Sequence, residues 1–190
     1  MQKIEIINLA LSRLGSPTIT DLKEGSDEAS KAAAVWDSAL ESTLQAYRWG
    51  FNTGREALGL LEESPAGYPY RYRYNAPTSM LQAYEIFDET PELGKPIPFL
   101  YEDGCIFTDK ENAVLVYAIR VNECSKFSPA FREALAWRLA GDMAMALTQR
   151  ADFAKMCQQN FMQAIDTAKA LAGNSRRAKR NIPQYLQARR

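Results

Sequence analysis

The stretch SPAFREALAWRLAGDMAMALTQR, residues 128–150, holds the clearest helix start in the chain, followed by an Ala-rich body. Ser128 is a residue type that caps helix N-termini, and Pro129 would take the first helical position, where its missing N–H costs no hydrogen bond. Small residues around Gly141 allow another helix to approach closely. The residues predicted to pack there, within the subunit or between subunits, are Trp137, Ala140, Gly141 and Ala144.

A second helical pattern follows, from about Asp152 to Leu171. Its shared apolar side consists of Phe153, Cys157, Phe161, Ile165 and Ala168. Because the link near Arg150 is very short, the two helices are predicted to pack antiparallel. Gly173 and Asn174 are residue types that end helices, so this helix is predicted to stop there.

Two more helices are predicted near the N-terminus. Apolar residues recur at helical spacing from Gln2 to Leu14, and Gly15 is suited to end that helix. Ser26 is suited to cap a second helix, which runs to about Trp49. The apolar stripe of this second helix consists of Trp36, Leu40, Leu44 and Tyr47.

The region between the helix pairs has the patterns of β-strands. Tyr and Arg alternate strictly in YRYRY, residues 70–74, which predicts a strand with an aromatic and a basic face. LQAYEIF, residues 81–87, is a further strand candidate. In residues 97–108, Asp103-Gly104 predicts a hairpin with a type I′ turn. The apolar run in residues 113–121 predicts a strand that is buried on both faces.

These elements predict an α+β fold that is mainly α. We expect a four-helix bundle with one small antiparallel sheet inserted at about residues 51–121, and an extended C-terminal tail. The bundle domain would cover residues 1–174 and the tail residues 175–190.

The tail concentrates positive charge. It contains six of the 23 basic residues and no acidic one, which leaves 17 basic against 23 acidic residues in the rest of the chain, a net charge of −6. Such a tail is predicted to bind a separate partner. The apolar island at 182–186 favours docking on a protein, because a purely electrostatic tail needs no anchor. The predicted contact residues are Arg176, Arg177, Lys179, Arg180, Tyr185, Leu186, Arg189 and Arg190.

Composition excludes several classes of function. The chain has no histidine, which removes Ser-His-Asp and Cys-His catalysis and the usual nitrogen ligands of zinc. We therefore expect no catalytic residue, no metal and no cofactor. Cys105, Cys124 and Cys157 fit neither a disulfide framework nor a C-x-x-C site, so reduced and mostly buried thiols are predicted. No apolar run is long enough to span a bilayer and no secretory signal is recognisable, so we expect an intracellular protein without membrane contact.

Several segments occur in an order that is known from one protein family. A first helix ends in LSRLGSPTITDL, residues 11–22, and a second ends in YRWGFN, residues 47–52. A β segment then begins with a Tyr-Pro element, and the helix in residues 127–147 follows the sheet. In these segments the chain resembles the tail tubular protein A family, the head-to-tail adaptors of tailed bacteriophages. Its strongly basic C-terminus departs from the family pattern.

The resemblance implies a structural role in the virion. Such adaptors form a ring of twelve subunits beneath the portal protein, with helical bundles side by side around the channel through which the genomic DNA passes. Their C-terminal segments reach the portal, and a downstream tail or nozzle protein follows below. The resemblance thus implies a homo-oligomer at the head–tail junction, present in the host cytoplasm during assembly, without sequence-specific DNA binding.

Two other functions remain open from the residues alone. A nucleic-acid-binding protein could use the basic tail, or stack bases on the tyrosines of residues 70–74 beside Arg71 and Arg73. A carboxylate-based hydrolase could use Glu85, Asp88 and Glu89. The three tryptophans, Trp36, Trp49 and Trp137, are predicted to pack in the core or at a subunit interface rather than to line a ligand pocket.

Overall fold

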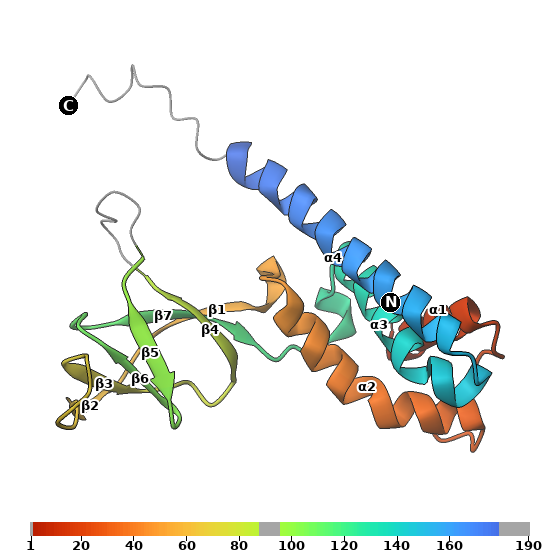
Figure 1. Ribbon diagram of the computed structural model, residues 1–190, viewed down its shortest axis with the longest axis horizontal. Coiled ribbons are helices and arrows are strands. Elements are labelled where there is room, and N and C mark those ends of the chain that lie inside the picture. The colour runs from red at the N-terminus through yellow and green to blue at the C-terminus, as the bar shows by residue number, and fades with distance from the viewer. Residues whose placement is uncertain (1, 88–95, 179–190) are drawn as a thin grey trace. The chain divides into compact units, whose positions relative to one another are not determined.

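The computed structural model describes residues 2–87 and 96–178, which fold into two compact units (Figure 1). One unit is built from the chain up to Tyr47 and from Glu123 onward, and it contains the helices. The other unit comprises Arg48–Asn122 and contains the strands.

The helical unit is organised around one helix. It consists of α1 (Lys3–Leu14), α2 (Asp27–Ala46), α3 (Pro129–Thr148) and α4 (Ala151–Ala178). The helices α1, α2 and α4 each pack closely against α3, and they contact each other far less. The shared core contains Ile7 and Leu11 of α1, Leu40 of α2, Leu135 of α3 and Phe161 of α4, all at most 5% exposed.

The predicted helix ends are confirmed at three places. Gly15 has a φ of 69°, the left-handed conformation that ends α1 and that glycine adopts without strain. The Ser26 hydroxyl accepts a hydrogen bond from the Ala29 N–H at 3.2 Å and caps α2. The Ser128 hydroxyl does the same for the Phe131 N–H at 3.2 Å, with Pro129 in the first turn of α3.

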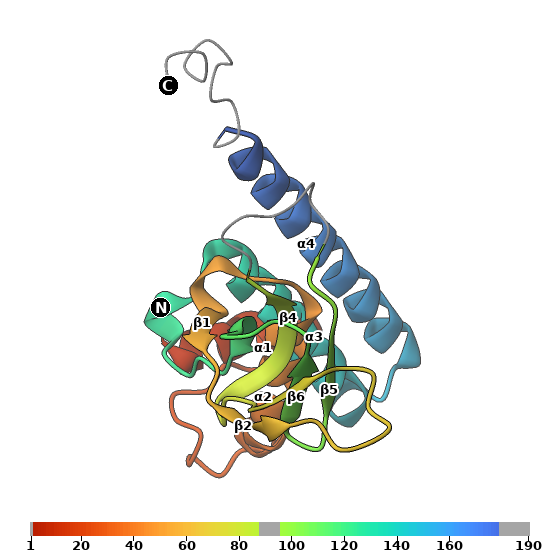
Figure 2. The ribbon, with the colours of Figure 1, turned by 90° about the vertical axis from the view of Figure 1, so that its left-hand side faces the viewer.

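The predicted end of the last helix is wrong. The helix α4 continues through Gly173 and Asn174 to Ala178 and therefore includes the first residues of the predicted extended tail. A glycine inside a helix costs only about 1 kcal/mol relative to alanine, and Ala- and Arg-rich neighbours on both sides favour the helical state. Within its own unit, α4 projects beyond the other helices (Figures 1 and 2).

The β unit contains two antiparallel sheets. Its strands are β1 (Thr53–Ala57), β2 (Leu60–Glu63), β3 (Tyr72–Asn75), β4 (Met80–Ile86), β5 (Phe99–Glu102), β6 (Cys105–Thr108) and β7 (Val114–Ile119). The first sheet has the order β1-β7-β4, and the second has the order β2-β3-β6-β5. Side chains of both sheets share one core, which is formed by Tyr74, Ile86, Ile106, Ala113, Leu115 and Tyr117.

Two strand predictions are confirmed in detail. The strands β5 and β6 pair antiparallel across Asp103 and Gly104, whose φ values of 48° and 70° are both positive, as a type I′ turn requires. The strand β7 lies between β1 and β4, and its residues from Leu115 to Ala118 are at most 5% exposed.

The prediction of a four-helix bundle with one small inserted sheet is wrong. The described residues form seven strands in two sheets with a core of their own, and the helices pack on α3 rather than in a closed ring of four. The strands β1 and β2 were missed because TGREA and LLEE show no alternation of apolar and polar residues. Their pairing depends on strands that are distant in sequence, which local patterns do not predict.

Candidate functional site

A groove lies between α3 and α4 on the helical unit. Its volume is about 260 Å³. It lies between the N-terminal half of α3 and the middle of α4. The residues that line it are Ala130, Glu133, Trp137, Asn160, Gln163, Ala164 and Thr167. Alanines, amides and one indole ring give it a mixed character that suits a peptide segment better than a charged metabolite.

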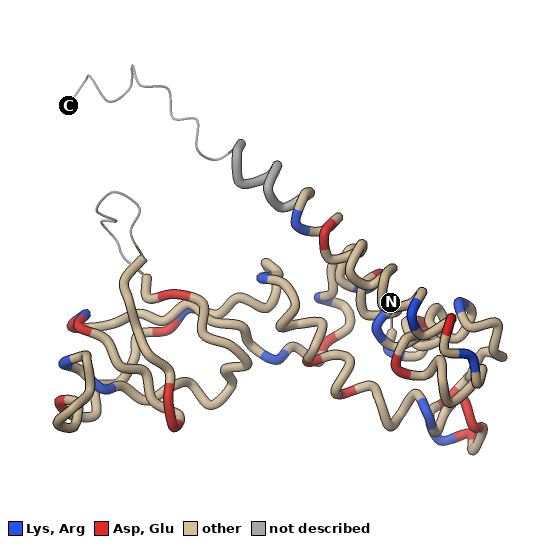
Figure 3. Tube along the Cα trace, in the orientation of Figure 1, with Lys and Arg blue, Asp and Glu red and all other residues tan. Residues whose placement is uncertain are grey.

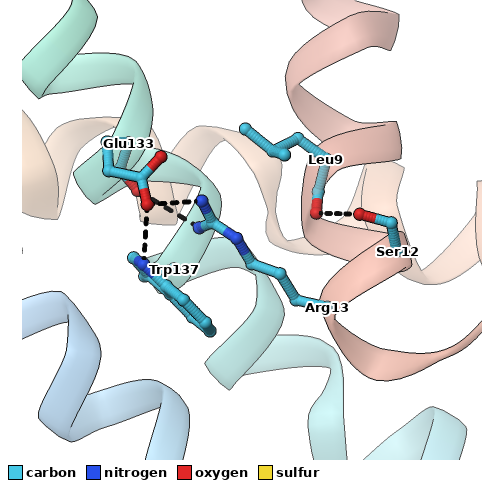
Figure 4. A network of polar contacts seen from close by, with 5 residues as sticks. All are labelled: Leu9, Ser12, Arg13, Glu133 and Trp137. Carbon is cyan, nitrogen blue, oxygen red and sulfur yellow. Dashed lines mark hydrogen bonds and ion pairs between the residues drawn. The ribbon is translucent and has the colours of Figure 1, made fainter.

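One side of the groove is fixed by Arg13, which reaches from α1 to α3 (Figure 4). Its guanidinium donates to the Glu133 carboxylate at 2.7 Å and lies 3.9 Å from the centroid of the Trp137 ring. The Trp137 indole N–H donates to the same carboxylate at 2.9 Å. Burial lowers the pKa of Arg13, and the neighbouring Glu133 partly opposes this shift. The network holds the Trp137 ring in one orientation beside the groove.

Of the small residues predicted for helix packing, Gly141 lies at the contact of α3 with α4. Ala140 and Ala144 are fully buried within the helical unit. A Cβ atom on Gly141 would lie 3.5 Å from the Cβ of Cys157 on α4, which is ordinary van der Waals contact. Trp137 and Gly141 are partly exposed, so Trp137 is the member of this predicted group that has a side chain accessible to a partner.

Exposed apolar side chains also occur on the same two helices. Met156 and Met162 of α4 are 40% and 49% exposed, Leu171 is 61% exposed, and Met145 of α3 is 53% exposed. Each of the four helices carries both acidic and basic residues (Figure 3). None of these helices therefore offers a face of a single sign of charge by composition.

Of the predicted tail contacts, Arg176 and Arg177 lie in the last turns of α4. The other members of that prediction are outside the described residues: Lys179, Arg180, Tyr185, Leu186, Arg189 and Arg190.

Two of the three tyrosines in residues 70–74, Tyr72 and Tyr74, pack in the β unit. Tyr74 is 1% exposed, and its hydroxyl donates to the Lys110 carbonyl at 2.8 Å. Tyr72 packs against the core of the β unit. The Arg71 guanidinium lies 3.5 Å from a Glu63 carboxylate oxygen, and its own N–H groups are therefore partly engaged. The strand thus serves the core of the β unit, and base stacking on Tyr74 is excluded.

The carboxylates suggested for a hydrolase are not assembled into a site. Glu85 pairs with Arg48 at 2.9 Å. Asp88 and Glu89 lie outside the described residues. Within residues 2–87 and 96–178 no group of three acidic or cysteine side chains could hold a metal ion.

The three cysteines form no disulfide, as predicted. Cys105 and Cys157 are buried and Cys124 is half-buried. Burial raises the pKa of the Cys124 and Cys157 thiols, which keeps them protonated and poorly nucleophilic at neutral pH.

The groove was not predicted from the sequence. The pair Glu133 and Trp137 has the i, i+4 spacing of helix neighbours, which is a local signal for their hydrogen bond. The contribution of Arg13 has no local signal, because 120 positions separate it from Glu133. A polar edge of α4 consists of Asn160, Gln163 and Thr167. This edge becomes a wall of the groove only because α4 packs on α3.

Comparison with models of known protein families and with curated protein sequences finds no match for this chain. In the described parts, none of the helices combines the length and the apolar character that crossing a membrane would require. A function for the chain therefore has to rest on its own residues and their arrangement.

Proposed function

We propose that this protein is a structural, non-enzymatic head-to-tail adaptor of a phage or prophage. It assembles as a ring of identical subunits under the portal protein, connects the capsid to the tail and surrounds the DNA channel. A downstream tail or nozzle protein binds below the ring. The protein is present in the host cytoplasm during assembly and then at the head–tail junction of the virion.

The observation that carries the proposal is the length of α4. Among the α4 residues whose burial is described, which end at Leu171, the last buried one is Ala168, and the helix continues for ten residues beyond it to Ala178, which corresponds to about 15 Å. In both ribbon views α4 projects out of its own unit (Figures 1 and 2). A projecting helix that leads into a basic segment is suited to present that segment to a partner, here the portal. The order of sequence motifs that resembles tail tubular protein A supports the same role.

The groove between α3 and α4 supports contacts with other chains. Trp137 is partly exposed there beside Ala130 and Ala164, and exposed tryptophans in hollows are enriched among the residues that dominate binding energy. In the proposed ring, this side of the helical unit is a candidate surface for assembly contacts. The absence of a histidine and the paired state of Glu85 support a role without catalysis.

The proposal is tested by size-exclusion chromatography with light scattering, on the protein alone and mixed with portal rings of the same phage or prophage. We expect a complex whose mass fits one adaptor subunit for each portal subunit. A lack of any complex at micromolar concentrations would contradict the proposal.

A second candidate is a nucleic-acid-binding protein, which the six basic residues of the C-terminal segment favour. The same preparation is titrated with double-stranded DNA at two salt concentrations. Tight binding with a steep salt dependence, together with no binding to portal, would favour this candidate over the adaptor.

A further inference from the structure

One row of side chains crosses the four-stranded sheet and ends in an exposed apolar residue at each edge. Leu60 of β2 pairs with Tyr74 of β3, and Tyr74 pairs with Ile106 of β6. Ile106 in turn pairs with Tyr101 of β5. The two middle residues are at most 1% exposed, whereas Leu60 and Tyr101 are 56% and 51% exposed. Paired residues share a face of the sheet, so the two end residues extend the face that packs in the core of the β unit.

The backbone groups of Tyr101 point away from the sheet. The Ala76 N–H donates to the Gly104 carbonyl at 3.0 Å, which makes these two residues a hydrogen-bonded pair between β3 and β6. Hydrogen-bonded and non-hydrogen-bonded pairs alternate along an antiparallel ladder, so Tyr74 and Ile106, two positions further on, are hydrogen-bonded as well. Ile106 therefore directs its N–H and C=O toward β3. Its partner Tyr101 directs its own N–H and C=O to the outer edge of β5.

The backbone groups of Leu60 point outward at the opposite edge. The Asn75 N–H donates to the Gly59 carbonyl at 3.3 Å, so this pair of β3 and the end of β2 is hydrogen-bonded. The next pair, Leu60 with Tyr74, is then of the non-hydrogen-bonded kind, and Leu60 directs its N–H and C=O away from β3. Both ends of the row thus combine an exposed apolar side chain with outward backbone groups, which is the combination that adds a further strand.

The two edges run in opposite directions, because the sheet has the order β2-β3-β6-β5 and all its pairs are antiparallel. Figure 2 shows β2 and β5 on either side of β6. A second copy placed beside the first in the same orientation therefore brings its β2 antiparallel to β5. Ile97 forms a bridge with Ile86 of β4 before β5 begins, and no described strand pairs with the outer edge of β5 beyond it. Tyr101 lies four residues, about 13 Å, past that bridge.

We infer that the β unit binds a second copy of this chain, with β2 of one copy added antiparallel to the outer edge of β5 of the next. Leu60 of one subunit then lies opposite Tyr101 of the partner subunit, and the two residues exchange both backbone hydrogen bonds. The contact is head-to-tail, and a head-to-tail contact that repeats with a constant rotation closes a ring. The inference specifies the subunit contact of the proposed ring and rests on that function for ring closure, whereas the contact itself is measurable without the portal.

The side chains of the two edges are compatible in this register. The contact removes from water two apolar side chains that are about half exposed in the single chain. The acidic residues fall on different rows, since Glu102 faces Gly59 and Glu63 faces Phe99, so these carboxylates do not oppose each other. The extra residue of β2, Leu61, interrupts the ladder and is 44% exposed, so the added ladder is short and apolar contact contributes much of the binding.

Pairing of like edges is the alternative arrangement. Two copies joined β2 to β2, or β5 to β5, form a two-fold dimer that leaves the other edge of each copy exposed. Such a dimer covers only one end of the row in each copy. The head-to-tail contact covers both ends, and it is the arrangement that a ring of identical subunits requires.

The test is disulfide cross-linking of introduced cysteines in the full-length protein. Cα atoms of a hydrogen-bonded antiparallel pair are about 5.5 Å apart, which a disulfide spans. The double variant Leu60→Cys, Tyr101→Cys should form a ladder of dimers, trimers and larger oligomers under mild oxidation. Each single variant alone should form no more dimer than the parent, which carries the native cysteines. A mixture of the two single variants should form dimers and nothing larger. The matched control, Leu60→Cys with Glu111→Cys, places the second cysteine at an exposed residue outside the strands and should behave like Leu60→Cys alone.

A charge at the edge provides a second measurement. Leu60→Lys should weaken self-association at least tenfold by light scattering, because lysine on an edge strand opposes strand addition. Thr78→Lys adds the same charge at an exposed residue between β3 and β4 and should associate like the parent. Adding Tyr101→Glu to Leu60→Lys should restore part of the association, since opposite charges then face each other across the contact.

Two results would overturn the inference. One is dimer formation above the parent level by Leu60→Cys alone or Tyr101→Cys alone, which would show pairing of like edges. The other is the absence of the ladder in the double variant, both free and in the presence of portal rings. If that variant still forms a complex with portal, the proposed function stands and the ring closes through other surfaces. If the ladder forms without any complex with portal, the contact stands and the proposed function is wrong.

Discussion

Arg13 of α1 stacks on Trp137 of α3, with its guanidinium carbon 3.9 Å from the centroid of the indole ring. The Arg13 side chain is only 11% exposed, and it also pairs with Glu133 at 2.7 Å. A single side chain thus ties the first helix to the central helix and fixes one wall of the groove.

Replacing Arg13 with Ala should destabilise the protein by about 1–3 kcal/mol, because a largely buried cation–π contact and the partner of Glu133 are lost together. Arg13→Lys should recover only part of this, since an ammonium group cannot stack on the ring while bonding Glu133 in the same geometry. Urea unfolding followed by far-UV circular dichroism measures the change. The control is Lys169→Ala, which breaks an exposed pair with Asp166 and should cost less than about 1 kcal/mol. Equal losses for Arg13→Ala and Lys169→Ala would show that the stacked geometry contributes nothing.

Gly141 tests how closely α3 and α4 pack. A Cβ there lies at ordinary contact distance, 3.5 Å, from the Cβ of Cys157, so Gly141→Ala should be neutral or stabilising by up to about 1 kcal/mol through helix propensity. Gly141→Leu adds three carbon atoms beyond a Cβ that already contacts Cys157 and should cost about 1–3 kcal/mol. Thermal melting compares the two variants. If Gly141→Leu melts at the same temperature as the parent, α4 is free to move away from α3.

The sequence predicts those features of the fold that a short stretch of residues determines. It does not predict features that depend on contacts between residues far apart in the chain. Helix starts at Ser26 and Ser128, the end at Gly15 and the hairpin at Asp103-Gly104 are local features, and all four are confirmed. The predicted end of α4 is wrong because a glycine can also lie inside a helix. Gly173 would end α4 only if the backbone after it left the helical conformation, and it does not. The separation into two sheets and the role of α3 as the central helix come from contacts between distant residues.

The same distinction applies to the candidate site. Trp137 was singled out from its place on a helix, but its partner Arg13 and the groove beside it follow from the packing of α1 and α4 on α3. The contact residues of the C-terminal segment are predicted from their charge or, for Tyr185 and Leu186, from the apolar island, and only Arg176 and Arg177 lie in the described part of the chain.

Gly54 in β1 tests the core of the β unit. A Cβ at this position would lie 3.0 Å from Ile119 Cγ2 and 3.1 Å from the ring of Tyr117 on the neighbouring strand β7. Gly54→Ala should therefore cost about 1–3 kcal/mol, because both side chains belong to a packed core and have little room to move. Near-UV circular dichroism during urea unfolding follows the tyrosines of this unit. The matched control, Gly59→Ala, meets nothing within 4 Å and should leave the midpoint unchanged. An equal loss in both variants would mean that the contacts with Ile119 and Tyr117 do not cause the effect.

Glu24 links the stability of the α1–α2 connection to pH. Its carboxylate accepts hydrogen bonds from the Thr20 N–H at 2.8 Å and the Ser26 hydroxyl at 2.8 Å. These bonds, that of the Thr20 backbone first, lower its pKa from 4.5 to about 2. Because the pKa is lower in the folded state, the stabilising contribution is complete above about pH 4.5 and is lost as the pH falls toward 2.

Glu24→Gln should therefore be less stable than the parent at pH 7, and the difference should narrow between about pH 4.5 and pH 2. Urea unfolding across this range measures it. Glu111→Gln, which changes an exposed carboxylate in the β unit, serves as the control and should give a small difference at every pH. If the difference in unfolding free energy between Glu24→Gln and the parent stays constant down to pH 2, the effect comes from packing and not from the charged carboxylate.

Variants of the C-terminal segment test which of its residues bind the portal. On the portal we expect Tyr185 and Leu186 to insert between portal subunits, with the six basic residues near portal carboxylates. Tyr185→Ala with Leu186→Ala keeps the charge and removes the anchor, so it should mainly raise the dissociation rate. Changing all six basic residues to Gln keeps the anchor and removes the charge, so it should mainly slow association and weaken its salt dependence. Surface plasmon resonance on immobilised portal rings separates the two rates, and a DNA titration of the same variants runs beside it. If the first variant binds portal as well as the parent does, while the second loses only DNA binding, the segment is a nucleic-acid-binding arm and the adaptor contact lies elsewhere on the chain.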